Sequence, residues 1–79
     1  MSTQKKTLLS IELNKSTEQI EIHCNEDGLL LLVDKLESLK SMKNDHIHLK
    51  TSEFGGDDLS SDLIGIENEK INELKIFLW

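Results

Sequence analysis

Residues 45–59 read DHIHLKTSEFGGDDL, and this stretch does most to decide the fold. Its first half alternates between apolar and polar side chains, with Ile47 and Leu49 set against His46, His48 and Lys50. Because successive side chains of a strand point to opposite faces, residues 45–51 are predicted to form a strand with the apolar pair turned inward. The second half holds an aromatic, two glycines and two acids, which predicts a loop over residues 52–62.

Three further strands are predicted from the same alternation. Residues 6–13 and 18–24 are joined by a short polar turn, the pattern of a β-hairpin. Residues 71–79 alternate again at the end of the chain, whereas residues 63–66 could form a short strand or an extended loop. In the hairpin, Cys24 shares the face of Ile20 and Ile22, so a buried thiol is expected there.

A helix is predicted between the hairpin and residue 45. Asn25 is a good N-cap, and the two acids that follow it favour the positive end of a helix. From there to residue 42 the apolar residues recur with helical spacing. They form one stripe, made of Leu29, Leu32, Val33, Leu36 and Leu39.

These elements, in the order ββαββ, predict an α+β fold. The economical arrangement is a small two-layer sandwich, a mostly antiparallel sheet with the one helix packed on one of its faces. The 79 residues suit a single domain, with residues 1–5 disordered. No run of apolar residues approaches the roughly 20 that a membrane-spanning helix needs.

The sheet face without the helix is the candidate functional surface. Alternation places His23, His46, His48, Phe77 and Trp79 on it. Exposed aromatic side chains are frequent anchors of protein interfaces. Three interpretations remain open: the face binds a partner, the loop 52–62 covers it with Phe54 against Trp79, or a homodimer buries it through Phe77 and Trp79.

The composition narrows the class of partner and the compartment. The chain has 15 acidic residues against 9 lysines, no arginine and a net charge of −6, which disfavours nucleic acid and anionic membranes and suits a basic protein partner. A single cysteine cannot form an internal disulfide, which fits a reducing cytoplasm. A chain this short also has little room for a deep substrate pocket, so no enzymatic activity is expected.

Two motifs have alternative chemical interpretations. His46 and His48 lie about 7 Å apart along a strand, and with His23 they could hold a metal ion, although no paired ligand motif accompanies them. More plainly, the imidazoles are hydrogen-bonding groups. Gly55 and Gly56 lack the residues of a phosphate-binding loop and predict a tight turn with positive φ. No cofactor is expected.

The histidine strand and the loop that follows it resemble a known family. Asp45-His46-Ile47-His48-Leu49, Thr51, Phe54-Gly55-Gly56 with Leu59, and the closing Leu74-Lys75-Ile76-Phe77-Leu78-Trp79 are similar to immunity protein family 32 of bacterial polymorphic toxin systems. The likeness covers roughly residues 18–79 and includes the leucine-rich helix. Phe54 stands where the family pattern favours tryptophan, which keeps the ring and loses an N–H donor.

The resemblance implies a cytoplasmic, non-enzymatic antidote that binds and neutralises a cognate toxin. It carries over His46, His48, Phe54, Gly55, Gly56 and Leu59 as the characteristic set. Since the chain is acidic, the toxin is expected to be basic, for example a nuclease. The candidate contact residues are His46, His48, Phe54, Gly55, Gly56, Asp57, Asp58, Phe77 and Trp79. A small metal-binding protein and a structural homodimer remain the alternatives.

Overall fold

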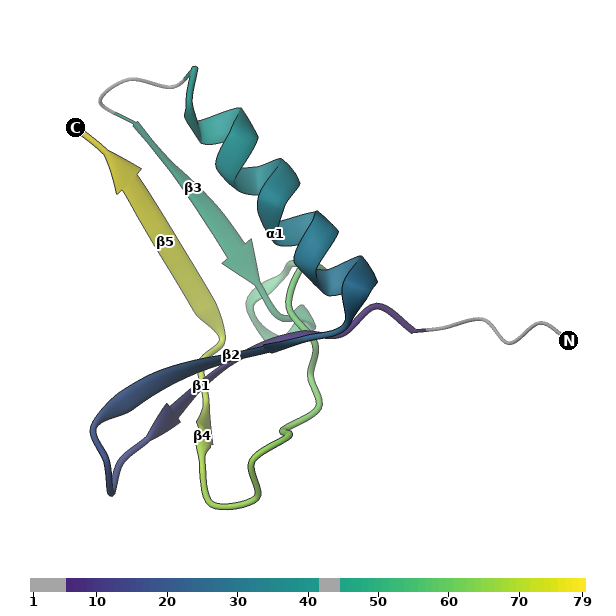
Figure 1. Ribbon diagram of the computed structural model, residues 1–79, viewed down its shortest axis with the longest axis vertical. Coiled ribbons are helices and arrows are strands. Elements are labelled where there is room, and N and C mark those ends of the chain that lie inside the picture. The colour runs from purple at the N-terminus through teal and green to yellow at the C-terminus, as the bar shows by residue number, and fades with distance from the viewer. Residues whose placement is uncertain (1–5, 42–44) are drawn as a thin grey trace, which may run out of the picture.

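The computed structural model describes residues 6–41 and 45–79, so residues 1–5 and the predicted end of the helix at residues 42–44 lie outside the described part. The elements follow the order β1 (Leu9–Asn14), β2 (Gln19–Cys24), α1 (Glu26–Leu39), β3 (Asp45–Lys50), the 3-10 turn η1 (Ser52–Phe54), β4 (Glu69–Lys70) and β5 (Glu73–Leu78). The predicted α+β architecture with antiparallel pairing is confirmed (Figure 1). Residues 63–66 form no strand, and the two-residue strand β4 follows them in a segment for which the sequence predicted no strand.

The strands form two antiparallel sheets. Sheet A has the order β2-β1-β4, and sheet B pairs β3 with β5. The segment from β4 to β5 changes partner between the sheets, because the Ile71 N–H donates to Ile11 O (2.8 Å) and the Asn72 carbonyl accepts from Thr51 N (3.0 Å). Thr51 is buried, and its hydroxyl also donates to the Asn72 side chain at 2.8 Å. This two-residue junction joins the sheets.

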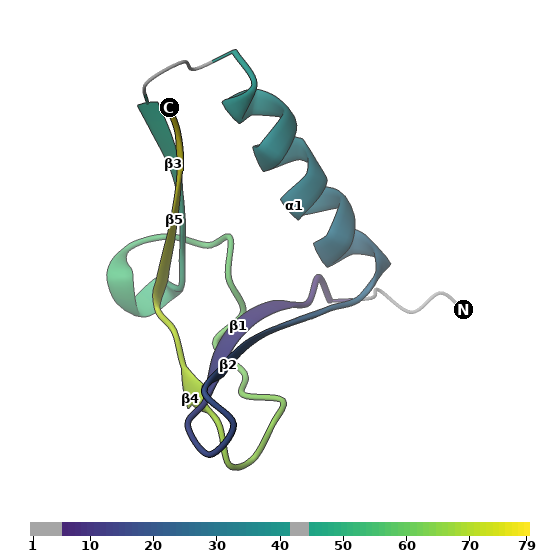
Figure 2. The ribbon, with the colours of Figure 1, turned by 60° about the vertical axis from the view of Figure 1, so that its left-hand side comes forward.

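Helix α1 covers one face of sheet B, as Figure 2 shows with that sheet nearly edge-on. Its N-cap is Asn25, as predicted, and the Asn25 carboxamide oxygen accepts from Gly28 N (2.9 Å) and from Leu8 N (3.1 Å). Between helix and sheets lies a core of six buried residues: Leu9, Ile11, Leu39, Ile47, Leu49 and Leu59.

The helix turns only one edge of its predicted apolar stripe toward this core. Leu39 is buried and Leu32 packs against the core, but Leu29, Val33 and Leu36 are exposed. Leu31, which lies outside the stripe, is partly buried instead. The close contact of Gly28 with Leu8 and Cys24 sets this rotation, because it brings the glycine side of the helix onto the hairpin.

The hairpin also differs from its predicted burial pattern. Strand β1 is buried on both faces, Ser10 and Glu12 included, because residues 64–68 cover the polar side. Strand β2 lies at the sheet edge, so Ile20 and Ile22 are exposed. The prediction of a buried Cys24 is wrong for the same reason, since this free thiol is exposed.

Glu12 is a fully buried carboxylate that holds sheet A to the following loop. It accepts from Ser10 Oγ (2.6 Å), Ile64 N (2.8 Å), Gly65 N (2.9 Å) and Asn68 Nδ2 (2.8 Å). Burial on its own raises the pKa of Glu12, but these hydrogen bonds outweigh burial and lower the pKa to about 2. The buried charge is therefore fully hydrogen-bonded and stabilises the folded chain.

Candidate partner-binding site

The outer face of sheet B carries a row of aromatic rings. The register sets His46 opposite Phe77 and His48 opposite Lys75, so their side chains lie on one face. The rings of His46 and Phe77 stack with centroids 4.7 Å apart, and those of Phe77 and Trp79 stack at 6.0 Å with planes only 8° apart. His48 meets His46 edge-on at 4.6 Å. We call His46, His48, Phe77 and Trp79 the aromatic row.

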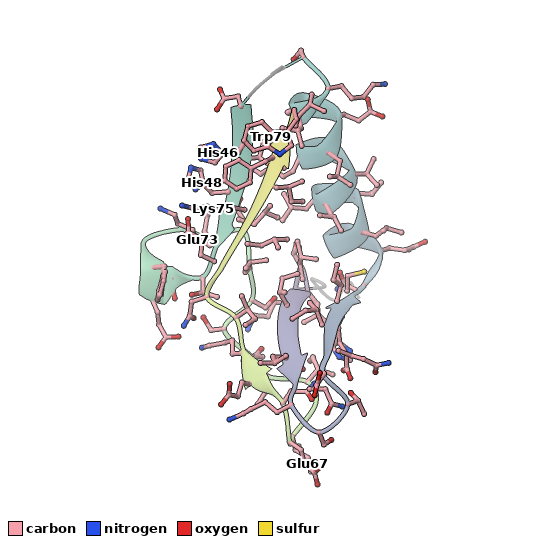
Figure 3. All side chains as sticks on the ribbon, turned by 90° about the vertical axis from the view of Figure 1, so that its left-hand side faces the viewer. His46, His48, Glu67, Glu73, Lys75 and Trp79 are labelled. Carbon is pink, nitrogen blue, oxygen red and sulfur yellow. The ribbon has the colours of Figure 1, made fainter. Side chains whose placement is uncertain are left out.

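Figure 3 shows His46, His48 and Trp79 on the side of sheet B that faces away from the helix, as the sequence predicts, and Phe77 shares this face because it lies opposite His46. Trp79 is 86% exposed and Phe77 is 49% exposed. The loop after β3 does not cover them: Phe54 follows the end of β3, whereas Trp79 follows the end of β5, which pairs with the start of β3. Phe54 is itself exposed. An exposed set of pre-stacked rings can bind a partner without first ordering its side chains.

Charged groups fix the histidines of the row. The Glu73 carboxylate lies 2.9 Å from His48 Nδ1, and this hydrogen bond, helped by Lys50 and Lys75, holds the pKa of Glu73 below its ordinary value against the opposing effect of desolvation. Asp45 lies 3.4 Å from His46 Nδ1. The row therefore combines apolar rings with a rim of both charge signs.

The Gly55–Gly56 turn has a structural role. Gly55 adopts φ +87°, the left-handed conformation predicted for this turn, and closes η1. A Cβ on Gly56 would lie 2.6 Å from Lys50 Cβ and 2.9 Å from Lys50 O. The chain passes this close because Gly56 N donates to Thr51 O, while Asp58 N and Leu59 N both donate to Lys50 O. The turn is thus hydrogen-bonded to the backbone at the end of β3.

Some of the residues that follow the two glycines pack against the rest of the protein, and others are exposed. Leu59 is buried in the core, and the half-buried Asp58 carboxylate lies 3.4 Å from Lys35 Nζ of the helix. Asp57 is exposed. Of the predicted contact residues in this loop, Phe54 and Asp57 are thus freely available to a partner, whereas Gly56 and Asp58 are committed to the fold.

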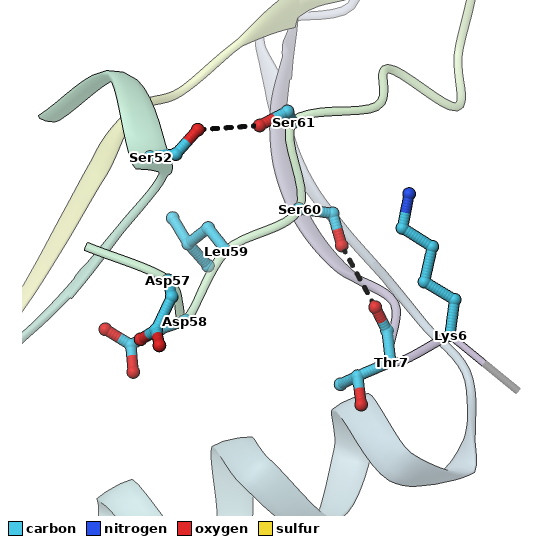
Figure 4. Close-up of a pocket in the computed structure, with 8 residues that line it drawn as sticks. All are labelled: Lys6, Thr7, Ser52, Asp57, Asp58, Leu59, Ser60 and Ser61. Carbon is cyan, nitrogen blue, oxygen red and sulfur yellow. Dashed lines mark hydrogen bonds between the residues drawn. The ribbon is translucent and has the colours of Figure 1, made fainter. Parts of the chain in front are cut away.

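A depression of about 260 Å³ lies beside this loop (Figure 4). It is lined by Lys6, Thr7, Ser52, Asp57, Asp58, Leu59, Ser60 and Ser61. Its three serine hydroxyls are already engaged: Ser52 and Ser61 contact each other at 3.3 Å, and Ser60 Oγ donates to Thr7 O at 3.4 Å. We assign it no ligand.

The three histidines do not come together as a metal site. His23 lies on sheet A, whereas His46 and His48 lie on sheet B. His23 instead joins Glu12 and Glu21, with Nε2 at 2.8 Å from Glu21 and 3.6 Å from Glu12. Hydrogen bonding by His23, Asn14 and Asn68 lowers the pKa of Glu21. Since the Glu12 oxygens already accept four hydrogen bonds, this group is a structural network.

Sequence reasoning missed Glu12. Alternation places it on the solvent-facing side of β1 with no distinguishing motif. The groups that bury it, Ile64, Gly65 and Asn68, follow it by 52 to 56 positions in the chain. Only the fold brings them together.

In the described part of the chain, no helix is long and apolar enough to cross a membrane.

Comparison with known proteins gives one family. The model of the Immunity protein 32 family matches residues 19–70, which span β2, the helix, the histidine strand and the glycine turn. Strand β5 lies beyond the matched residues, so the aromatic row combines two residues inside the match with two outside it. No curated protein and no solved structure matches the chain significantly. Because the match covers well over half of the chain, this protein belongs to the Immunity protein 32 family.

Proposed function

We propose that this protein neutralises a cognate bacterial polymorphic toxin by binding it directly through the aromatic row. The observation that supports the proposal best is the stacked series His46, Phe77 and Trp79 on the face opposite the helix, of which Phe77 and Trp79 are exposed. Large rigid rings contribute much contact area at low cost in side-chain entropy. The exposed Phe54 and Asp57 extend the contact residues that we propose.

The charge of the chain supports a basic toxin, such as a nuclease. A net charge of −6 attracts a basic protein over a distance of about 8 Å at physiological salt. Electrostatic attraction speeds association, whereas desolvated aromatic contacts hold the complex together. We place this encounter in the cytoplasm of the cell that makes the toxin.

Binding without catalysis is sufficient for this role. Each of the three histidines contacts a carboxylate: His23 meets Glu21, His46 meets Asp45 and His48 meets Glu73. These contacts orient the imidazoles as hydrogen-bonding groups at the surface. The family and the small size of the chain support our proposal of a non-enzymatic inhibitor.

Substituting Trp79 or Phe77 by alanine tests the proposal. If the toxin encoded beside this gene is the partner, W79A and F77A should each weaken its binding by at least about thirtyfold, because an interface hot spot contributes about 2 kcal/mol or more. Calorimetry on the purified pair measures the loss, and growth of cells that co-express the toxin reports protection.

Ile66→Ala is the matched control, because Ile66 is 91% exposed and lies on the loop before β4, away from the aromatic row. It should leave both affinity and protection unchanged. Wild-type affinity in W79A and F77A would contradict the aromatic row as the contact surface. Absence of any complex between the wild-type protein and the toxin would contradict direct inhibition.

A further inference from the structure

The open edge of strand β2 has the features of a self-pairing surface. In sheet A, β2 is hydrogen-bonded to β1 on one side, and no described element pairs with its other side. Ile20 is 60% exposed and Ile22 is 49% exposed. Natural edge strands are commonly protected by proline, lysine or a bulge. The β2 sequence QIEIHC contains no proline or lysine, and its pairing with β1 is continuous. Its carboxylate, Glu21, accepts hydrogen bonds from Asn14 and Asn68 of the same chain.

The hydrogen bonds of β1 show which backbone groups of β2 are free. Leu9 N donates to Ser60 Oγ and Leu9 O accepts from Ser60 N, while Ile11 O accepts from Ile71 N. These groups therefore point away from β2. In an antiparallel pair of strands, the backbone N–H and C=O groups of two directly opposite residues either all point toward the partner strand or all point away from it. Cys24, opposite Leu9, and Ile22, opposite Ile11, thus direct their N–H and C=O groups to the open edge. By alternation, so does Ile20.

We propose that β2 pairs in an antiparallel manner with β2 of a second copy of this chain, with the two-fold axis at Ile22. This register sets Ile22 opposite Ile22 and Ile20 opposite Cys24. The outward-pointing backbone groups of all three residues in each strand are then hydrogen-bonded across the dimer. Shifting the register by two residues in either direction leaves some of these groups unpaired.

Charge complementarity selects the same register. With the axis at Ile22, Glu21 lies opposite His23 of the second copy, a carboxylate facing an imidazole. A shift of the axis toward the N-terminus would set Glu21 against Glu21, and like charges directly opposite each other are destabilising. A shift toward the C-terminus would set the two His23 side chains against each other. The axis at Ile22 avoids both.

The resulting dimer has one continuous six-stranded sheet, β4-β1-β2-β2-β1-β4. Its apolar side gains a seam of Ile20, Ile22 and Cys24 from both copies, which all lie on the face of Leu9 and Ile11. The aromatic row lies on sheet B and remains free in each copy. The dimer therefore does not compete with the proposed toxin contact, and its failure would leave that proposal intact.

Light scattering on the full chain tests the assembly. At high micromolar concentration the wild type should have twice the mass of one chain and should dissociate on dilution. Ile22→Lys, which sets a charge at the axis, should be a folded monomer by circular dichroism. A monomeric wild type would overturn the proposal. So would a dimer that persists in I22K or that depends on Phe77 and Trp79.

Disulfide trapping tests the register. Directly hydrogen-bonded pairs have Cα atoms about 5.5 Å apart, within the range that a disulfide spans. Ile22→Cys in a Cys24→Ser background should therefore cross-link two chains about tenfold or more faster than Leu30→Cys in the same background, because pairing raises the effective thiol concentration. Leu30 is an exposed helix residue away from the β2 edge.

A second pair of variants makes the register unambiguous. Ile20→Cys should cross-link to the native Cys24 of the second copy. The same substitution combined with Cys24→Ser should not cross-link, because the two residue-20 positions would lie about 13 Å apart along the strands. Cross-linking in this double variant, or equal rates for I22C and L30C, would contradict the proposed pairing.

Discussion

Glu12→Gln is expected to destabilise the folded chain by about 3 kcal/mol at neutral pH. The carboxylate accepts four hydrogen bonds from Ser10, Ile64, Gly65 and Asn68 while fully buried. Glutamine replaces one acceptor oxygen by an NH₂ donor that would face these donors, so buried N–H groups lose their partners. Urea unfolding followed by circular dichroism measures the loss. In a domain of this size it corresponds to a fall in melting temperature of more than 10 °C, on the order of 4–8 °C per kcal/mol.

The same carboxylate gives the wild type a defined acid sensitivity. The pKa of Glu12 falls from 4.5 to about 2 on folding, so its contribution is complete above pH 4.5 and is lost as the pH falls toward 2. Wild-type stability should decline over this window, and E12Q should decline less. Glu67→Gln is the matched control, because Glu67 is exposed on the same loop (Figure 3). E67Q should stay within about 0.5 kcal/mol of the wild type. An E12Q variant as stable as the wild type at pH 7 would contradict the assigned role of Glu12.

Gly28→Ala is expected to destabilise the chain by at least about 2 kcal/mol, although alanine is favoured over glycine inside helices by about 1 kcal/mol. A Cβ at this position would lie 1.7 Å from Leu8 O and 2.7 Å from Leu8 C. Leu8 cannot move away easily, because its carbonyl accepts from Asn25 N and its N–H donates to Asn25 Oδ1. Thermal and urea unfolding measure the change.

Gly55→Ala is the comparison for the glycine substitution. Beyond its two chain neighbours, no atom of residues 6–41 and 45–79 lies within 4 Å of a Cβ at Gly55, so its cost comes only from the positive φ of +87° and should be about 1 kcal/mol. G28A should therefore be clearly less stable than G55A. A stabilised G28A variant would mean that helix propensity outweighs the contact between the helix and Leu8.

Short-range pattern predicted most of the elements, but not their burial. The alternation of residues 45–51 gave both the strand and its outer histidines, and Asn25 gave the helix start. By contrast, the apolar periodicity of the helix did not reveal that only Leu32 and Leu39 of its stripe would meet the core. That rotation follows from a backbone contact between Gly28 and Leu8, which hydrophobic spacing does not encode.

The candidate site was predictable where it depends on neighbouring residues. Strand alternation assigned His46 and His48 to one side of their strand and Phe77 and Trp79 to one side of theirs. The β3–β5 register, which local alternation does not encode, then brings the rings of His46 and Phe77 together. The exposure of Ile20, Ile22 and Cys24 was not predictable, since it depends on β2 being an edge strand. Strand order depends on pairing between residues far apart in the chain, which the local sequence pattern does not encode.

The glycine turn has a consequence for how this protein can evolve. Gly55, Gly56 and Leu59 anchor the loop on the backbone of Lys50 and on the core, independently of the side chains on the outer face of sheet B. Because exposed side chains contribute little to folding, substitutions in the aromatic row leave the scaffold intact. If the aromatic row is the toxin contact that we propose, a lineage can exchange one toxin specificity for another by a few surface replacements while it retains a single fold.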